Sequence, residues 1–338
     1  LVANSLDIPD TTTANSFHTD ADGNSWWGAA SLANAVAKIL KTGAATFTSI
    51  TISGYVVNTK GSFGGDGSDG ALAITSGTTT ISAASASTLI KNYSSISITS
   101  TGKLAFSTPN TNGTAIILKS QGAGILTSTA LGADGSTLGC IDGSGMGGDG
   151  GAEEANGNAA YPFGIQTNFG LGNNGTGSVA GGAIGSYVLN SFTNLQTKYL
   201  QIFCGAGGGG GEGAPGGTGS DGAGGLVIEC AGDLNFPVTA GIYAKGTPGG
   251  AGGSATSGGG GGGGGGSVYI LYKTATSAAG VITVTGGAGG AKGTNASGAG
   301  GGGGSKTAGA AGQSQAQGGV GGAGGDGLSY IGVNNELT

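Results

Sequence analysis

The chain has 338 residues, of which 83 are glycine and only 8% are charged, and its net charge is −6. It contains no arginine, the residue of choice for phosphate and base recognition, which argues against a nucleic-acid partner. No apolar stretch approaches the roughly 18–20 residues that a membrane span needs, so we expect no membrane span.

The first 45 residues are predicted to form a segment for attachment or assembly. Residues 1–24 are polar and lack the apolar core of a signal peptide. A helix is expected over residues 26–40, capped by Asn24 or Ser25 and ended by Gly43. Its apolar stripe is narrow and rich in alanine, which favours packing against another copy of the chain. The residues predicted to carry this assembly are Trp26, Trp27, Leu32, Val36 and Leu40. The adjacent tryptophans either bury one ring at the start of the helix or anchor another subunit.

Short strands with alternating apolar and polar residues are predicted to follow over residues 46–142. The alternating segments are residues 46–53, 72–75, 79–82, 95–99 and 103–106, with turns at Gly54, Gly77 and Gly102. Strands at this spacing are typical of a β-sandwich or of the coils of a β-solenoid.

A loose internal repeat links this region to the second half of the chain. Residues 115–135, 226–250 and 268–290 each contain an apolar strand, a polar turn, an alternating strand and then glycine. Repetition of a unit that cannot bury its own apolar face predicts an architecture of stacked units.

Glycine dominates residues 143–338 and recurs there in triplets such as GGA-GGA and GGV-GGA-GGD. A period of three matches neither a helix nor a strand but the extended polyproline II helix. Bare edges allow backbones to approach as closely as only glycine permits, and residues 258–266 carry no side chain at all. A flexible linker or disorder is the alternative. Low charge and recurrent apolar segments favour an ordered body.

The predicted fold class is therefore all-β with a short N-terminal helix. The β-sandwich or β-solenoid strands are followed by a glycine-rich body of packed polyglycine II helices. The predicted domains are an N-terminal attachment segment (1–45), a β-strand domain (46–142) and a glycine-rich domain with interspersed strands (143–338).

Few residues of the sequence are suited to catalysis. There is a single histidine, His18, and the adjacent Glu153 and Glu154 would point to opposite faces of a strand rather than act as a pair. We therefore expect no enzymatic activity and no cofactor. The three cysteines, Cys140, Cys204 and Cys230, lack metal-site spacing. They are interpreted as buried free thiols, with a Cys204–Cys230 disulfide as the alternative.

Two patterns resemble calcium motifs but are expected to bind no metal. Residues 64–69, 216–221 and 321–326 match GGxGxD, yet they stand alone rather than in tandem. Asp20, Asp22 and Asn24 match the start of an EF-hand loop, whose glycine and final glutamate are missing.

The glycine blocks from Gly205 to Gly327 resemble the distal adhesins of tailed phages, which fold as a sandwich of polyglycine II helices. The segment Lys41–Gly54 (KTGAATFTSITISG) is similar to the opening of many phage fibre proteins. This resemblance implies that loops at the helix ends bind the host surface. Those adhesins typically carry aromatic residues in these loops, whereas residues 254–257 and 305–317 have none.

The resulting hypothesis is a non-catalytic structural fibre or adhesin of a phage virion, located on the virion or at the cell surface. Its expected partners are copies of itself in a trimer or filament, virion or surface-structure proteins, and host surface glycans. The residues predicted to contact a receptor are Asn295, Lys306, Gln313, Gln315 and Gln317. The alternative is the repeating subunit of an extracellular filament.

Overall fold

The computed structural model describes most of the chain, in two compact units that are treated separately below. The described residues are 6–8, 17–29, 31–43, 45–47, 63–153, 155, 162–163, 202–294, 299–305, 309–313 and 320–333. The first unit covers Leu1–Asn58 and the second covers Thr59–Thr338.

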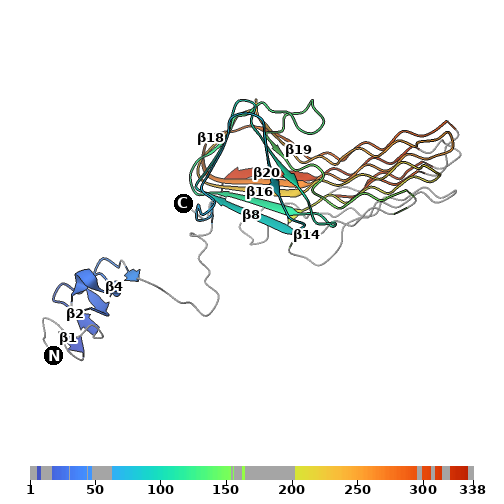
Figure 1. The fold of residues 1–338 in the computed structure, drawn as a ribbon. Helices are drawn as coiled ribbons and strands as arrows, with labels where there is room; N and C mark the ends of the chain where they lie inside the picture. The colour runs from blue at the N-terminus through green and yellow to red at the C-terminus, as the bar shows by residue number, and fades with distance from the viewer. Residues whose placement is uncertain are drawn as a thin grey trace. The chain divides into compact units, whose positions relative to one another are not determined.

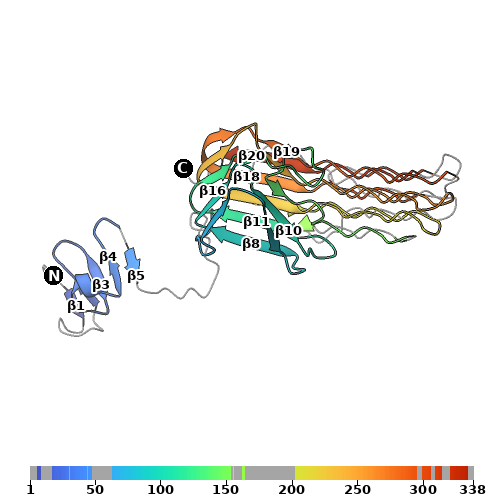
Figure 2. The ribbon, with the colours of Figure 1, turned by 45° about the horizontal axis from the view of Figure 1, so that its top comes forward.

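The first unit contains a five-stranded antiparallel sheet in the order of the sequence (Figure 2). Its strands are β1 (Leu6–Ile8), β2 (Phe17–Thr19), β3 (Ser25–Trp27), β4 (Ala37–Ile39) and β5 (Ala45–Phe47). A single 3-10 turn, η1 (Leu32–Asn34), lies between β3 and β4.

The helix predicted over residues 26–40 is therefore wrong. Trp26 pairs with His18 and Lys38 across the sheet, and Gly28 has a φ of 77°, which ends any regular helix there. An alanine-rich stripe offers a helix little apolar surface to bury, whereas cross-strand pairs of large aromatic side chains stabilise a sheet.

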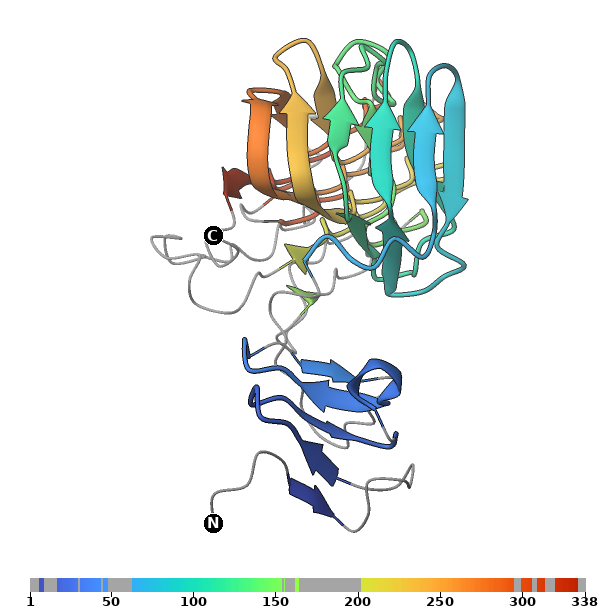
Figure 3. The same cartoon turned by 90° about the vertical axis from the view of Figure 1, so that its left-hand side faces the viewer.

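The second unit is built on two sheets of parallel strands (Figures 1 and 3). The larger, eight-stranded sheet contains β6 (Ala71–Ile74), β8 (Thr88–Tyr93), β9 (Ser95–Ile98), β11 (Ala115–Ser120), β12 (Gly124–Leu126), β16 (Gly225–Phe236), β18 (Ser267–Ala278) and β20 (Leu328–Val333). The smaller, five-stranded sheet contains β7 (Thr78–Ser82), β10 (Lys103–Ser107), β13 (Ile141–Asp142), β17 (Gly241–Tyr243) and β19 (Val281–Thr283). A separate antiparallel pair joins β14 (Pro162–Phe163) to β15 (Ile202–Phe203).

The strands of the two sheets are arranged in three tracks, which we number for reference. Track 1 runs β8–β11–β16–β18–β20 and uses the first halves of the long strands β16 and β18. Track 2 runs β6–β9–β12–β16–β18 and uses their second halves. Track 3 is the smaller sheet, β7–β10–β13–β17–β19. The three repeats seen in the sequence lie side by side, since β11, β16 and β18 are neighbours in track 1.

The main hydrophobic core lies between the two sheets and is formed by rows of aliphatic side chains that run across the strands. One such row in track 3 consists of Leu104, Ile141, Ile242 and Ile282, each beside the next in register. The first three are fully buried. Burial of each such side chain contributes about 1.5–3 kcal/mol.

The glycine-rich parts of the chain connect strands of the sheets. They run outward from one strand and return to the next, and together they form a bundle of extended segments (Figure 1). We call this the glycine bundle; its described segments are residues 147–153, 205–211, 217–224, 244–252, 257–266, 284–293, 299–305, 309–313 and 320–327. Successive backbone amides bond to different neighbours with a period of three. The N–H groups of Gly208, Gly209 and Gly210 donate to the carbonyl oxygens of Ser220 (2.8 Å), Gly301 (2.9 Å) and Ala155 (2.8 Å).

At its glycines the bundle is held by backbone contacts that leave no room for a side chain. A Cβ added at Gly262 would lie 2.1 Å from the carbonyl oxygen of Gly287, and one added at Gly205 would lie 1.9 Å from that of Gly264. Hydrogen bonds between backbones satisfy the polar groups that such close packing buries.

The predicted fold class is wrong as a whole. The described residues contain no α-helix, and the two main sheets of the second unit are parallel, one of them curled into a half-barrel, in place of a sandwich or solenoid. Alternation along a strand indicates that one face is buried, but it does not distinguish parallel from antiparallel neighbours. The crossover connections that parallel strands need are supplied by strands of the other tracks and, between β17 and β18 and between β19 and β20, by long glycine segments.

Candidate functional site

The candidate site is the group of turns at the end of the glycine bundle that points away from the sheets. Residues 205–211 follow β15 and residues 217–224 lead into β16, so the turn at residues 212–216 lies at the outer end. The same reasoning places residues 253–256 there, because they separate the segment after β17 from the segment before β18. We call these turns, with residues 291–294, the outer turns.

Hydrogen bonds within the Ser254–Ser257 turn hold it in one conformation. The Ser254 N–H donates to Ser257 Oγ at 2.7 Å, and the Ser257 hydroxyl donates to the Ser254 carbonyl oxygen at 2.9 Å. Ser257 is fully buried, whereas Ala255 and Thr256 are exposed. The turn is therefore held by the buried Ser257 side chain and presents the Thr256 side chain to solvent.

The outer turns also contact one another through their backbones. The Gly253 N–H donates to the Pro215 carbonyl oxygen at 3.0 Å, the Gly258 N–H donates to that of Glu212 at 2.8 Å, and the Gly293 N–H donates to that of Ser257 at 3.0 Å. These bonds join three turns that are far apart in the sequence into one surface. Its exposed side chains are small or polar and include Pro215, Thr256, Lys292 and Thr294.

One of the predicted receptor-contact residues lies in the described part of the chain. Gln313 is exposed, and its carbonyl oxygen accepts from the Ala299 N–H at 3.3 Å. Gly300, which follows Ala299, donates its N–H to the Gly259 carbonyl oxygen at 3.0 Å. Because Gly259 lies close to Ser257 in the chain, this contact places Gln313 at the outer end with Ser257. Asn295, Lys306, Gln315 and Gln317 lie outside the described residues.

The five predicted assembly residues are placed in the first unit but do not share one face. Trp26 stacks on His18, with ring centroids 5.0 Å apart, and donates its indole N–H to the Ala29 carbonyl oxygen. Trp27 faces the other side of β3, packs against Phe17 at 4.9 Å and is 38% exposed. Val36 is exposed, and Leu32 and Leu40 are half-buried.

Sequence reasoning missed three residues that share a face with Trp27. The strand register places Trp27 beside Phe17 and Ala37, and Ile39, which is 41% exposed, follows on the same face of β4. Once residues 26–40 were interpreted as a helix, the period of two that relates Ala37 to Ile39 carried no information.

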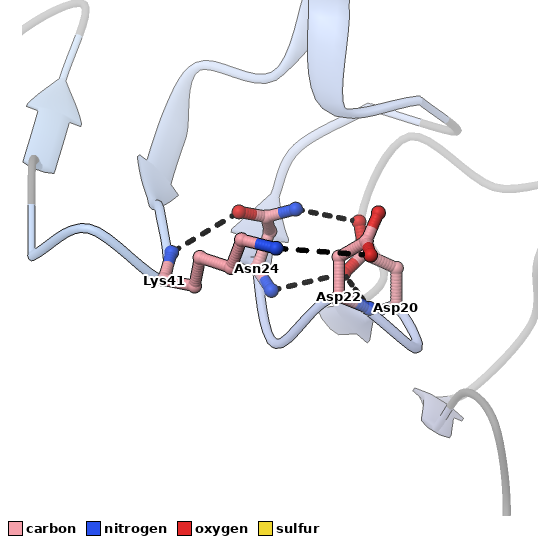
Figure 4. A network of polar contacts seen from close by, with 4 residues as sticks. All are labelled: Asp20, Asp22, Asn24 and Lys41. Atoms are coloured by element: carbon pink, nitrogen blue, oxygen red, sulfur yellow. Dashed lines mark hydrogen bonds and ion pairs between the residues drawn. The ribbon is translucent and has the colours of Figure 1, made fainter.

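The Asp20–Asn24 segment, which resembles an EF-hand start, forms a turn that fastens β2 and β3 to the end of β4 (Figure 4). Asp20 accepts hydrogen bonds from the Asn24 N–H and side-chain amide, both at 2.9 Å. Asn24 Oδ1 in turn accepts from the Lys41 N–H at 3.1 Å. The hydrogen bonds from the Asn24 side chain and backbone lower the pKa of Asp20. Asn24 is thus engaged in this turn and caps no helix.

The aspartates of the GGxGxD segments bond to the protein itself. Asp69 accepts from the Asn92 N–H at 2.6 Å and pairs with Lys91 at 3.0 Å. Asp221 accepts from the Gly150 N–H, and Asp326 accepts from the Gly286 N–H. No group of three or more His, Cys, Asp or Glu side chains among the described residues is arranged to hold a metal ion.

The three cysteines are free and buried, so the structure contains no Cys204–Cys230 disulfide. Burial raises the pKa of the Cys140 and Cys204 thiols to about 12 and that of Cys230 to about 11. Because the thiolate is the reactive form, these side chains act as small apolar groups of the core.

The comparisons with known proteins give no further assignment. No protein-family model matches the chain, and neither a curated protein nor a solved structure is significantly similar to it. The described residues contain no helix long and apolar enough to cross a membrane.

Proposed function

We propose that this chain is a non-catalytic structural fibre or adhesin protein of a phage virion that attaches to a host surface through the outer turns. In this role it acts outside the cell, on the virion, and host surface glycans are its ligands. The observation that supports the proposal most strongly is the glycine bundle. It is a shaft held together by backbone hydrogen bonds, and it ends in turns that bond to one another.

Such a shaft suits the presentation of a binding surface. Its interior contains few side chains, and the buried Ser257 and Ser305 hydroxyls are hydrogen-bonded to backbone carbonyl oxygens. The bonds from Gly253 to Pro215 and from Gly293 to Ser257 fix the turns before any ligand binds. Pre-organisation of this kind lowers the entropy cost of binding. Hydroxyl, amide and ammonium groups on Thr256, Thr294, Gln313 and Lys292 can hydrogen-bond to the hydroxyl groups of a sugar.

The test has two readouts. The first is binding of the purified full chain to cells of the host, and the second is the protection from infection that the bound protein gives those cells. The double variant Thr256→Lys/Thr294→Lys should reduce cell binding at least tenfold, because the long charged side chains would cover the outer turns. The control variant places lysine at Thr239 and Ala133, which are exposed in turns beside the sheets, and should bind as the unmodified protein does.

A second variant, Gln313→Ala, tests the predicted receptor-contact loop at its described member. Equal loss of binding in the Thr239/Ala133 control would contradict the role of the outer turns. Regular polymers that form from the protein alone and have no affinity for any cell would instead favour the filament subunit.

A further inference from the structure

The two ends of the parallel sheets are incomplete in complementary ways. We call one strand position along a track a level. At one end, track 1 continues to β20, while tracks 2 and 3 stop one level earlier, at the second half of β18 and at β19. At the other end, tracks 2 and 3 begin with β6 and β7, while track 1 begins one level later, at β8. Among the described strands, one end therefore supplies the track that the other end lacks.

From this geometry we propose that the β6–β7 end of one copy docks on the β19–β20 end of a second copy. The two ends then share one level. β20 fills track 1 beside β8 of the second copy, whose β6 and β7 fill tracks 2 and 3 beside β18 and β19. All strands stay parallel, so repetition of the same contact gives an open, head-to-tail assembly.

Incomplete burial of the core is concentrated at these two ends. The aliphatic row of track 3 is fully buried at Leu104, Ile141 and Ile242, but its last member, Ile282, is only half-buried. The other core residues that remain partly exposed are also near the open edges: Leu72, Ile81, Leu89, Tyr272, Ala278, Val284 and Ile331. Docking would remove this apolar surface from water, at about 25 cal/mol per Å².

Extension of the observed register places side chains of compatible size beside each other across the joint. In track 3, Thr79 belongs to the row that ends at Ile282, so it would lie beside Ile282 of the other copy. In track 2, Leu72 belongs to the row that ends at Ala275, where a small side chain leaves room for a large one.

The same register also matches the outer face of track 1. Ile90 and Tyr330 are the two ends of one row there, and Ile90 is 50% exposed. Docking would place these two side chains together.

The edge strands of track 3 carry no feature that would prevent pairing, whereas β8, the edge of track 1, contains Lys91, which pairs with Asp69 at 3.0 Å. Proteins commonly block an open edge with lysine, proline or a bulge. β7 has the sequence TTTIS and β19 has the sequence VIT, so neither contains a charge or a proline. The backbone groups of Gly77 and Ala83 bond to β10, and by alternation those of Thr78, Thr80 and Ser82 point to the open side.

The joint has a defined limit in track 1. The segment before β6 already lies beside the end of β8: Asp69 N–H donates to the Asn92 carbonyl oxygen at 2.8 Å, and Ser68 forms a bridge with Tyr93. β20 can therefore pair with Thr88–Lys91, through its residues Leu328–Ile331. Gly332 and Val333 pass beyond the paired region.

Disulfide crosslinking between copies tests both the contact and its register. The register places Thr78 beside Val281 of the other copy, and both side chains are exposed. Full chains with Thr78→Cys and Val281→Cys are mixed and oxidised, and crosslinked dimer is quantified on a non-reducing gel. The native cysteines are buried and do not interfere. A single chain that carries both substitutions should form a ladder of multimers.

The control mixes Thr78→Cys with Val238→Cys, which is 65% exposed but lies in the turn before β17, away from both edges. We expect at least tenfold faster crosslinking for Val281→Cys than for Val238→Cys. Equal rates would overturn the joint, and so would faster crosslinking of Val281→Cys with itself than with Thr78→Cys.

The Thr80→Pro variant removes an outward N–H and should weaken self-association in sedimentation at unchanged thermal stability. The joint does not depend on surface binding, because the outer turns are separate from both edges; either proposal can fail without the other.

Discussion

Within the glycine bundle, single glycines are required by the distance between backbones rather than by a left-handed conformation. Gly262 has backbone on every side: the added Cβ would meet Gly287 Cʹ at 2.6 Å and the Ala288 carbonyl oxygen at 2.7 Å, besides the oxygen at 2.1 Å. Neighbouring backbone cannot move aside by changing a rotamer. A side chain there must separate two segments and break the hydrogen bonds between them.

We therefore predict that Gly262→Val destabilises the protein by about 3 kcal/mol or more, beyond the usual range for overpacking. The control is Ala288→Val, which gives the same final side chain at an exposed position of the adjacent segment and should cost less than about 0.5 kcal/mol. Urea denaturation of both variants measures the difference. Equal stability of the two variants would show that the bundle is not close-packed at Gly262.

Asp134 makes the stability of the turn before β13 dependent on pH. Desolvation raises the pKa of this carboxyl, but hydrogen bonds from the N–H groups of Thr137 and Ser136 and from the Thr137 hydroxyl, together with Lys245, outweigh it and lower the pKa overall. In the unfolded chain the group titrates near 3.8. Its contribution to stability is thus complete above that pH and is lost as the pH falls below it.

We predict that the urea midpoint of the unmodified protein falls between pH 5 and pH 2.5, and that Asp134→Asn reduces this fall. Asparagine keeps an acceptor for the two N–H donors but does not titrate. The Thr137→Val variant, which removes only the hydroxyl donor, should give an intermediate pH dependence. An unchanged pH profile in Asp134→Asn would show that Asp134 contributes nothing to it.

Among the strands of track 3, β10 and β13 are joined by a buried ion pair. Lys103 Nζ lies 2.7 Å from Asp142 Oδ2, and the Asp142 side chain is only 5% exposed. Asp142 Oδ1 accepts from the Ser144 N–H at 3.0 Å and from its hydroxyl at 2.6 Å. Both oxygens of this carboxylate are therefore engaged within the protein, Oδ2 by Lys103 and Oδ1 by two donors of Ser144.

Removal of one partner should leave an uncompensated buried charge. We predict that Lys103→Met destabilises the protein by about 3–5 kcal/mol, whereas the double variant Lys103→Met/Asp142→Asn recovers most of the loss. Thermal or urea denaturation of the two single variants and the double variant gives the coupling energy. Simple additivity of the two single effects would contradict a direct interaction.

Most strands of the second unit could be predicted from the sequence, whereas their pairing could not. Alternation over residues 79–82 and 103–106 corresponds to β7 and β10, and the strand predicted at 95–99 corresponds to β9. Their parallel pairing joins strands that are separated in the chain by other strands of the two sheets, and no local pattern specifies it. The helix failed because Ala29, Leu32 and Ala33 fit a helical period, while the pairing of Trp26 and Trp27 with β2 is a non-local contact.

The candidate site could be located in the sequence only coarsely. Glycine triplets indicate where the bundle lies, and its outer end follows from the gaps between them, such as residues 253–256. The bonds that unite the turns, such as that from Gly253 to Pro215, join residues far apart in the chain. No periodicity encodes such contacts.

At the scale of the whole molecule, two different kinds of interaction stabilise the second unit. The sheets enclose an apolar core, whereas the glycine bundle is held by backbone hydrogen bonds, each of which contributes about 0.5–1.5 kcal/mol net. Ordering glycine costs more conformational entropy than ordering any other residue. The bundle therefore depends on its attachment to the sheets, whose strands fix the start and the return of its segments.

The position of the assembly contacts in the chain can be decided by truncation. The first unit was expected to mediate assembly through Trp26, Trp27 and the residues near them, whereas the head-to-tail joint lies wholly in the second unit, between β6–β7 and β18–β20. Residues 59–338 form a compact unit with their own core. This fragment should therefore fold alone and unfold at the same urea concentration as it does in the full chain.

If the joint is correct, the fragment of residues 59–338 keeps the Thr78→Cys to Val281→Cys crosslink at a rate within about twofold of the full chain, because both edges remain. If residues 26–40 are needed for self-association, the fragment stays monomeric in sedimentation and the crosslink falls to the level of the Val238→Cys control. Trp27→Ala in the full chain separates the two contributions without a deletion. Because Trp27 is exposed in the first unit, its loss should weaken association through that unit and leave the crosslink between β7 and β19 unchanged.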